Sequence, residues 1–280
     1  MGLVVRVLYE EGLSTYSQIY LRVFGGSLLG ILIILPKVKF SKFREESLGN
    51  YGFLLLRSIL FYVFGVIFFV KAYSLAKFSN VAFIQSIPTT AILGFVLFRE
   101  KLTFMKVLLV LSAFFGSVLI SLEKSNGMFQ IGMGELYAIF SIIAFAFAFV
   151  SRKWYKGQLN DIEIAELMMI FGCLIIFLIA ILSGESFPEF TQFSTVVVIA
   201  LLSGAVLQVA NLFIYNYSFK RIENVIASNL MTLESFFGLV IGYLIYSEFP
   251  NLLEILGGII IAVSAVLINI CSTRNAHKKL

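Results

Sequence analysis

Nine apolar segments, each long enough to form a helix across a bilayer, fill most of this 280-residue chain. A membrane-spanning helix needs about 20 apolar residues, because each residue rises about 1.5 Å and the hydrocarbon core is about 30 Å thick. Hydrophobic residues make up 60% of the chain and charged residues 13%, against about 45–50% and about 25% in soluble domains. The sequence therefore predicts an all-α polytopic membrane protein with short connectors. The expected spans are 16–36, 53–75, 80–98, 103–122, 131–151, 163–182, 194–218, 224–246 and 251–271.

The basic residues of the connectors alternate along the chain in a way that orients these spans. If the loop after the first span faces the cytoplasm, fifteen Lys and Arg residues lie inside and three outside. Such an excess of positive charge is typical of cytoplasmic loops. We therefore expect an integral protein of the bacterial cytoplasmic (inner) membrane with its C-terminus in the cytoplasm. The inner residues lie within 37–44, 99–106, 152–156, 220–221 and 274–279, and the outer ones are Arg6, Lys77 and Lys124.

The inventory of reactive side chains argues against several classes of protein. Cys173 and Cys271 lie in different apolar spans, and His277, the single histidine, lies in the polar tail. No disulfide, metal site or cofactor is implied. No His or Cys accompanies a serine in a plausible catalytic arrangement, so we do not expect an enzyme. The net charge of +5 is explained by the inner loops and does not indicate a nucleic-acid partner.

The two halves of the chain show a weak internal repeat. An offset of 144 residues aligns Tyr73-Ser74 with Tyr217-Ser218 and Asn80-Val81 with Asn224-Val225. Offsets of 147 and 148 align Phe24-Gly25 with Phe171-Gly172 and the segment 118–120 with 266–268. These identities occur in order and in corresponding helices, which favours a true repeat over chance.

The repeat predicts a helix that the first half largely lacks. The second half has five spans, and the counterpart of its first span, 131–151, would lie before residue 5, so that only a last turn at 3–5 is present. Five spans in each repeat turn the second copy over in the membrane, the inverted arrangement of many secondary transporters. We expect two inverted five-helix repeats with the first helix of repeat 1 largely missing, that is, nine full transmembrane helices. Either the start codon is misassigned or the protein works with nine helices.

Two segments carry a resemblance to a known family. They are 71–102, KAYSLAKFSNVAFIQSIPTTAILGFVLFREKL, with its mid-helix Pro88, and 229–248, NLMTLESFFGLVIGYLIYSE. Together with the repeat, they make the chain similar to the EamA-like branch of the drug/metabolite transporter (DMT) superfamily. The resemblance implies two EamA-like repeats at 1–122 and 131–271, a cytoplasmic tail at 272–280, and a central cavity between the halves.

The resemblance also implies a function, and the sequence departs from the family in two respects. The implied function is transport of a small organic solute, such as a metabolite, an amino acid or a drug, by an alternating-access secondary transporter or facilitator. The first helix is largely missing, and a Glu-Pro pair of the family is Glu234-Ser235 here, which predicts the loss of a kink. The alternative is a non-transporting membrane scaffold or receptor derived from a transporter.

Polar residues inside the spans are the candidate site. Glu234 lies near the middle of its span, where a carboxylate facing lipid is costly. It either binds an amine or a coupling proton, or it forms a hydrogen bond to a neighbouring helix. On the preceding span, Gln208, Asn211 and Tyr215 share one helical face with Ser218, and that face either contacts solute or links helices.

Further polar residues within the spans are weaker candidates for the same solute site. Arg22 lies six residues inside its span, and Lys71 lies near an outer end, where it could meet an anion or extend to water. Arg57, four residues from an inner end, is expected to extend its guanidinium to water. The remaining candidates are Asn229 and Thr89.

Pairs of small residues four positions apart predict close approach of helix backbones. The pairs are Gly26/Gly30, Ser112/Gly116, Gly238/Gly242 and Gly258/Ala262. They favour packing within one chain, and a homodimer face is the alternative. The expected partners are thus the lipid bilayer, a small-molecule solute, and a coupling proton or a second copy of the chain.

Overall fold

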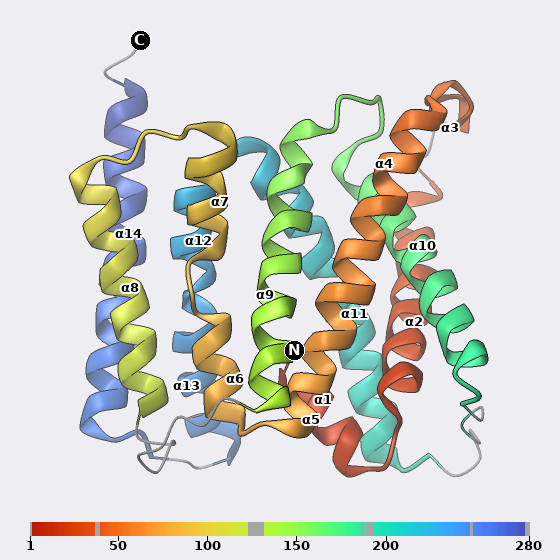
Figure 1. The fold of residues 1–280 in the computed structure, drawn as a ribbon, viewed down its shortest axis with the longest axis horizontal. Helices are drawn as coiled ribbons and strands as arrows, with labels where there is room; N and C mark the ends of the chain where they lie inside the picture. The colour runs from red at the N-terminus through yellow and green to blue at the C-terminus, as the bar shows by residue number, and fades with distance from the viewer. Residues whose placement is uncertain are drawn as a thin grey trace. The chain divides into compact units, whose positions relative to one another are not determined.

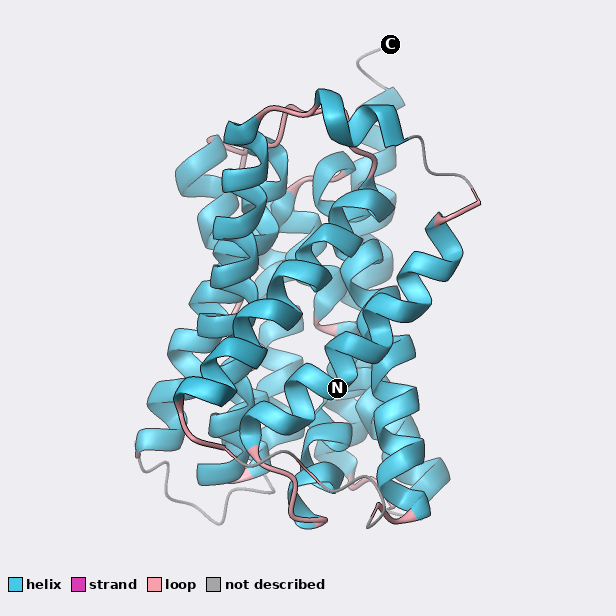
Figure 2. Cartoon of the chain, turned by 90° about the vertical axis from the view of Figure 1, so that its right-hand side faces the viewer, coloured by secondary structure: helices cyan, strands magenta, loops and turns pink. Residues whose placement is uncertain are grey.

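The structure is a computed structural model that describes residues 2–36, 40–122, 132–185, 188, 193–246 and 249–277. Its regular elements in these ranges are helices joined by turns and loops (Figure 2). In this part of the chain, nine helices are long and apolar enough to cross a membrane. The prediction of an all-α protein with nine spans is confirmed.

The helices of the first half are α1 (Gly2–Glu10), α2 (Thr15–Ile34), α3 (Phe40–Glu45), α4 (Leu48–Ser58), the π-helix η1 (Ile59–Ile67), α5 (Phe68–Leu75), α6 (Phe78–Gln85), α7 (Thr89–Phe98) and α8 (Phe104–Leu122). Those of the second half are α9 (Met133–Val150), the 3₁₀ turn η2 (Ser151–Trp154), α10 (Asp161–Leu182), α11 (Thr195–Arg221), α12 (Asn224–Met231), α13 (Leu233–Tyr246) and α14 (Leu252–His277).

Two helix ends differ most from the expected spans. The second span begins at Leu48 and not at residue 53, because the Ser47 hydroxyl accepts the Asn50 N–H and caps the helix. The last helix continues to His277, so that residues 272–277, expected in the tail, are helical. Residues 278–280 lie outside the described part of the chain.

The N-terminal segment is a helix of nine residues, longer than the single turn expected at 3–5. Val5 and Leu8 of α1 are buried, and α1 packs against α11, α5 and α2. The helix ends in a turn in which Gly12 has a φ of +85° and the Leu13 N–H donates to the Leu8 carbonyl. This left-handed glycine reverses the chain into α2.

The chain forms two compact units, each of which combines helices from both expected repeats. Unit 1 comprises 1–75 and 143–221, and unit 2 comprises 76–142 and 222–280, with α9 divided between them. Unit 1 therefore holds α1, α2, α4, η1 and α5 together with α10 and α11, whereas unit 2 holds α6, α7 and α8 together with α12, α13 and α14.

In unit 1, the helices that the sequence repeat makes equivalent pack antiparallel. The offset of 147 places α2 on α10 and the α4–η1–α5 span on α11. Ser27 contacts Glu166 and Tyr20 contacts Phe177, so residue numbers rise along α10 as they fall along α2 (Figure 1). Likewise Arg57 binds Asn216 and Tyr62 binds Gln208. Antiparallel packing of equivalent helices is what an inverted repeat requires.

Unit 2 shows the same relation. The offset of 148 places α8 on α14, which lie side by side (Figure 1). A Cβ at Gly116 would lie 2.7 Å from the Gly257 carbonyl oxygen, and Ser264 donates to the Leu109 carbonyl. These pairs again run antiparallel. They show that the small residue Gly116 serves backbone packing, as predicted.

Both equivalent spans of unit 2 are interrupted near their middle. In the first, residues 86–88 separate α6 from α7, and Pro88 explains the break because it lacks an N–H. In the second, Thr232 separates α12 from α13, and its hydroxyl donates to the Asn229 carbonyl at 2.6 Å. The prediction that Glu234-Ser235 removes the kink was wrong, because a threonine that bonds back to its own helix also bends it.

Candidate functional site

A buried polar pair occupies the middle of unit 1, where side chains of two equivalent spans meet. The Gln208 amide of α11 donates to the Tyr62 hydroxyl of η1 at 3.1 Å, and both side chains are buried. Tyr62 is one of nine residues in a π-helix, a rare conformation that recurs at functional sites. Hydrogen bonds in a π-helix span one residue more than those in an α-helix, so Tyr62 lies on a different face than it would in a regular α-helix.

A glycine on the facing helix makes room for the tyrosine ring. A Cβ added at Gly172 of α10 would overlap with the Tyr62 ring. At Gly26 of α2, an added Cβ would lie 3.5 Å from the Gln208 Cβ, an ordinary van der Waals contact. The Tyr62 ring thus lies directly against the α10 backbone, while Gln208 packs less tightly beside α2.

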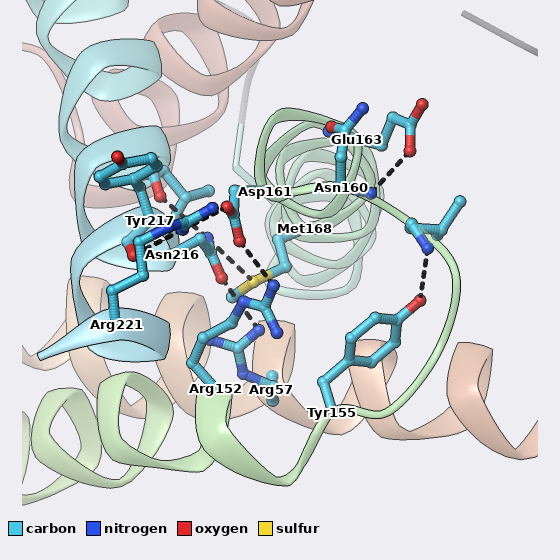
Figure 3. Close-up of polar contacts among 12 residues, drawn as sticks. Arg57, Arg152, Tyr155, Asn160, Asp161, Glu163, Met168, Asn216, Tyr217 and Arg221 are labelled. Atoms are coloured by element: carbon cyan, nitrogen blue, oxygen red, sulfur yellow. Dashed lines mark hydrogen bonds and ion pairs between the residues drawn. The ribbon is translucent and has the colours of Figure 1, made fainter. Parts of the chain in front are cut away.

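A cluster of charged side chains lies at the end of unit 1 where α10 begins (Figure 3). Asp161, the first residue of α10, accepts from Arg152 of η2 and from Arg221 of α11, each at 2.6 Å. Arg152 is 1% exposed, and its Nε and Nη1 atoms make no hydrogen bond in the described structure. A single buried carboxylate thus accepts hydrogen bonds from two guanidinium groups.

Arg57 lies in the same cluster and does not extend to water as expected. Its guanidinium donates to the Ala148 carbonyl, the Ser151 hydroxyl and the Asn216 side-chain oxygen, and the residue is 2% exposed. Because α4 begins at Leu48, Arg57 lies deeper in its span than the sequence suggested. It links α4 to α9, η2 and α11.

A carboxylate outside the spans connects the segment before α4 to the loop between η2 and α10 in unit 1. Glu46 accepts from the Tyr155 hydroxyl at 2.8 Å, the Gln158 N–H at 2.9 Å and the Asn50 amide. Burial raises the pKa of this carboxyl, but the hydrogen bonds together outweigh burial and hold its pKa below the usual range. Glu46 is therefore an ionised acceptor at neutral pH.

Glu166 of α10 is a membrane-embedded carboxylate that the sequence analysis missed. It is buried, and it accepts a hydrogen bond from Ser27 of α2 at 2.5 Å. The signal was present, because an acidic residue six positions inside an apolar helix is costly wherever it occurs. Asn216 was missed as well, although its neighbours on α11 were selected.

The predicted polar face of α11 is only partly the buried one. The buried stripe contains Gln208, Leu212 and Asn216, whereas Asn211 and Tyr215 lie half-buried beside it. The Tyr215 ring packs against Phe149 with centroids 4.3 Å apart. The structure thus places Gln208 beside Tyr62, whereas Tyr215 packs against the aromatic ring of Phe149.

Two predicted cations of unit 1 lie on α2 and α5, away from the Asp161 cluster. Arg22 is buried, its Nε donates to the Gln18 carbonyl at 2.8 Å, and its stem fills the space above Gly204. Lys71 is half-buried with its ammonium 5.9 Å from the centre of the Tyr16 ring. Gln18 itself is fully buried, and neither polar atom of its side chain has a hydrogen-bond partner in the described structure.

Three predicted residues lie in unit 2. Asn229 is fully buried, and its amide donates to the Leu109 carbonyl at 3.0 Å and to the Ser264 hydroxyl at 2.9 Å, which joins α12 to α8 and α14. Thr89 begins α7 directly after Pro88 and is half-buried. Glu234 lies in the first turn of α13 and is exposed.

These features define a class of protein. Nine spans, equivalent helices packed antiparallel, interrupted helices and buried polar groups at membrane depth describe an integral membrane protein of inverted-repeat design. No group of three or more His, Cys, Asp or Glu side chains in the described part of the chain could hold a metal ion.

Comparison with known proteins identifies the family. The EamA-like transporter family matches twice, at residues 2–122 and 132–270, and the chain belongs to this family. A solved crystal structure of a protein shares the fold, with a TM-score of 0.73 at 14% sequence identity over 98% of this chain and 95% of that one. No match to a curated protein was found. The resemblance to the drug/metabolite transporter superfamily is confirmed.

Proposed function

We propose that the chain carries a small organic solute across the bacterial cytoplasmic membrane by alternating access. The observation that supports this most directly is the Tyr62–Gln208 pair, two polar groups buried at mid-membrane where equivalent spans of unit 1 cross. A hydroxyl and an amide in this position are able to exchange their mutual hydrogen bond for bonds to a solute. The family, whose members are transporters, supplies the class of activity.

The proposed solute contacts differ between the units. In unit 1 they are Gln208 with Tyr62, and Asn211 and Tyr215 beside them, while Arg22 and Lys71 attract anionic groups in the outer half. In unit 2 they are Thr89 and Glu234, each in the first turn of the helix that follows a break. Asn229 is left out, because its amide is engaged in packing three helices.

Orientation and assembly are part of the same proposal. The fifteen basic residues of alternate loops support a cytoplasmic C-terminus. The small-residue stripes need no second copy where they pack within the chain, as Gly26 and Gly116 do. We therefore propose a monomer as the transporting unit, with a homodimer as the alternative.

Solute flux into proteoliposomes tests the function. The reconstituted protein is offered a panel of radiolabelled amino acids and other metabolites, and counterflow identifies those transported. Gln208→Ala and Glu234→Gln should then each lower the flux about tenfold or more, since one lost hydrogen bond to a charged or polar solute is worth about 1.5 kcal/mol. Matched controls are Gln158→Ala and Glu10→Gln, the same changes at exposed positions outside the spans.

Two outcomes would contradict the proposal. If both variants at membrane depth transport as the parent does, these residues do not contact solute. If no solute of the panel is transported by a well-folded parent, the scaffold or receptor alternative becomes the better account.

A further inference from the structure

The Glu166 carboxyl group is buried between α10 and α2 within the membrane-spanning part of unit 1. It lies five residues after Asp161, about 7.5 Å along the helix. The residue is 6% exposed. A carboxyl group at this depth is outside the reach of bulk water in the conformation observed.

The two oxygens of Glu166 have different surroundings. Oε1 accepts from the Ser27 hydroxyl at 2.5 Å. Oε2 is buried and has no hydrogen-bond partner in the described structure. Gly30 allows this placement, because a Cβ at that position would overlap with Oε2. The carboxyl group therefore lies directly against the backbone of α2, with one oxygen unsatisfied.

Tyr62 of η1 is close enough to interact electrostatically with Glu166, and Cys173 lies seven residues, about two turns, further along α10. Both are neutral acids in their ordinary state and supply no positive charge. Among the residues that the structure describes, no Lys or Arg lies within ion-pair distance of Glu166.

The cations on the elements packed around α10 are engaged elsewhere. On α3, Lys42 faces Glu163 at 3.9 Å, and Arg57 of α4 binds Ala148, Ser151 and Asn216. Arg22 of α2 donates to the Gln18 carbonyl. The inner end of α11 contributes Arg221, which with Arg152 of η2 binds Asp161.

Comparison with other carboxylates in the same unit shows how unusual this environment is. Asp161 accepts from two arginines, and Glu163 accepts the Asn160 N–H in a capping box and faces Lys42. Glu166 has a single neutral donor. A buried anion with one hydrogen bond and no counter-ion is strongly unfavourable, and a carboxyl group in that position takes up a proton instead.

We infer that Glu166 is a protonation site inside the membrane, and, resting on the transport function proposed above, that it carries the coupling proton. In the conformation observed the proton is on Oε2, and Ser27 donates to Oε1. When the conformational cycle brings water to the carboxyl group, Oε2 releases the proton to that water, and on the opposite side it takes one up. The assignment makes Glu166, and not Glu234, the residue that senses the proton gradient.

Infrared spectroscopy of the purified full-length chain in lipid nanodiscs tests protonation without any solute. We expect a carbonyl stretching band of a protonated carboxylic acid at neutral pH that shifts in D₂O. Glu166→Gln should abolish this band, whereas Glu163→Gln, the same change one turn earlier on α10, should leave it in place. The inference is overturned if the parent has no such band or if the band survives in Glu166→Gln.

Two further variants keep the glutamate and test its surroundings, should Glu166→Gln fail to fold. Ser27→Ala removes the donor to Oε1 and should move the band to higher frequency. Gly30→Ala forces the carboxyl group away from α2 and should shift the band as well. An unchanged band in both variants would show that another acid produces it.

Transport under a pH gradient tests coupling separately. For a solute found by counterflow, accumulation in the parent should change about tenfold for each unit of pH gradient, as expected for one proton per solute. Glu166→Gln should still exchange solute but lose this dependence. A parent whose accumulation ignores the gradient contradicts coupling while the transport function stands. If nothing is transported, the transport function fails and the infrared band still decides protonation.

Discussion

The two units are built on the same inverted pairing of helices, yet they bury ionisable side chains at different places in those helices. In unit 1, Arg57 and Glu166 are buried several residues inside α4 and α10. In the described part of unit 2, the buried ionisable residues lie in the first turns of their helices, namely Lys106, Glu135 and Glu254. In unit 2, α8 and α14 approach through Gly116 and Gly257, and the amide of Asn229 ties them to α12. Unit 1 thus holds ionisable groups inside its spans, whereas unit 2 holds them near helix ends and brings two helix backbones into close contact.

The difference indicates a division of labour. An ionisable group inside a span with an unsatisfied atom, such as Glu166 with Oε2, costs stability and is a candidate for a functional role. Glycine contacts such as Gly116 with Gly257 bring backbones together and favour a rigid body. We therefore expect substitutions in unit 1 to act through charge and those in unit 2 through volume.

The largest effect is expected from Asp161→Asn in unit 1. This change leaves Arg152 and Arg221 without their shared carboxylate, and breaking a buried ion pair costs about 3–5 kcal/mol. Thermal unfolding in detergent can be followed by the fluorescence of Trp154, the single tryptophan, which lies two residues from Arg152. Glu10→Gln, which removes the exposed partner of Arg6, is the control and should have little effect.

Equal melting temperatures for these two variants would show that the cluster does not stabilise unit 1.

A smaller loss of stability is expected from Gly116→Ala in unit 2, and its cause is added volume instead of a lost ion pair. The added Cβ would lie 2.7 Å from the Gly257 carbonyl oxygen, and overpacking of this kind costs about 1–3 kcal/mol. Gly238→Ala is the matched control, because nothing lies within 4 Å of its added Cβ and alanine favours the helix. Melting temperatures measured by circular dichroism should fall for the first and hold or rise for the second. The same sign for both would contradict the packing argument.

Asn229→Ala should cost about 1 kcal/mol, since it removes two hydrogen bonds between α12 and its neighbours. A double-mutant cycle with Ser264→Ala isolates their mutual bond, for which we expect a coupling of about 0.6 kcal/mol. Solute flux should be unchanged where folding is retained. A loss of flux in a well-folded Asn229→Ala variant would indicate that Asn229 contacts solute after all.

The smallest effect is a pH dependence at Glu46, in the segment before α4 of unit 1. Because hydrogen bonds lower the folded-state pKa of Glu46, its contribution is fully present above the unfolded pKa and is lost as pH falls through the lower folded pKa. The melting temperature should therefore decline on acidification, and Glu46→Gln should decline less. If the melting temperatures of the parent and of Glu46→Gln fall equally with pH, Glu46 does not contribute to this pH dependence.

Most of the fold could be predicted from the sequence because bilayer thickness fixes helix length. The spans, the inverted repeat and the family follow from apolar length and from a few spaced identities. Helix ends were less accessible, since the Ser47 cap and the turn at Gly12 depend on local hydrogen bonds. The break at Thr232 was predicted wrongly, because proline was taken as its only cause.

The polar groups were harder to assign than the helices. Regular helical periodicity selected Asn211 and Tyr215 beside Gln208, whereas the buried stripe continues through Asn216. The π-helix around Tyr62 also changes the facing residues in a way that a regular period does not foresee. The role of each candidate as a solute contact stays a prediction.

The hydrogen bonds of Arg57 have a consequence for how the chain is made. Its partners Ala148, Ser151 and Asn216 lie 91, 94 and 159 residues further along the sequence. When α4 leaves the ribosome and enters the membrane, none of these partners has been synthesised. The guanidinium must stay at the lipid headgroups, or keep water with it, until α9 and α11 follow. Unit 1 can therefore complete its assembly only after the second half of the chain has been inserted, because the hydrogen-bond partners of Arg57 come from that half.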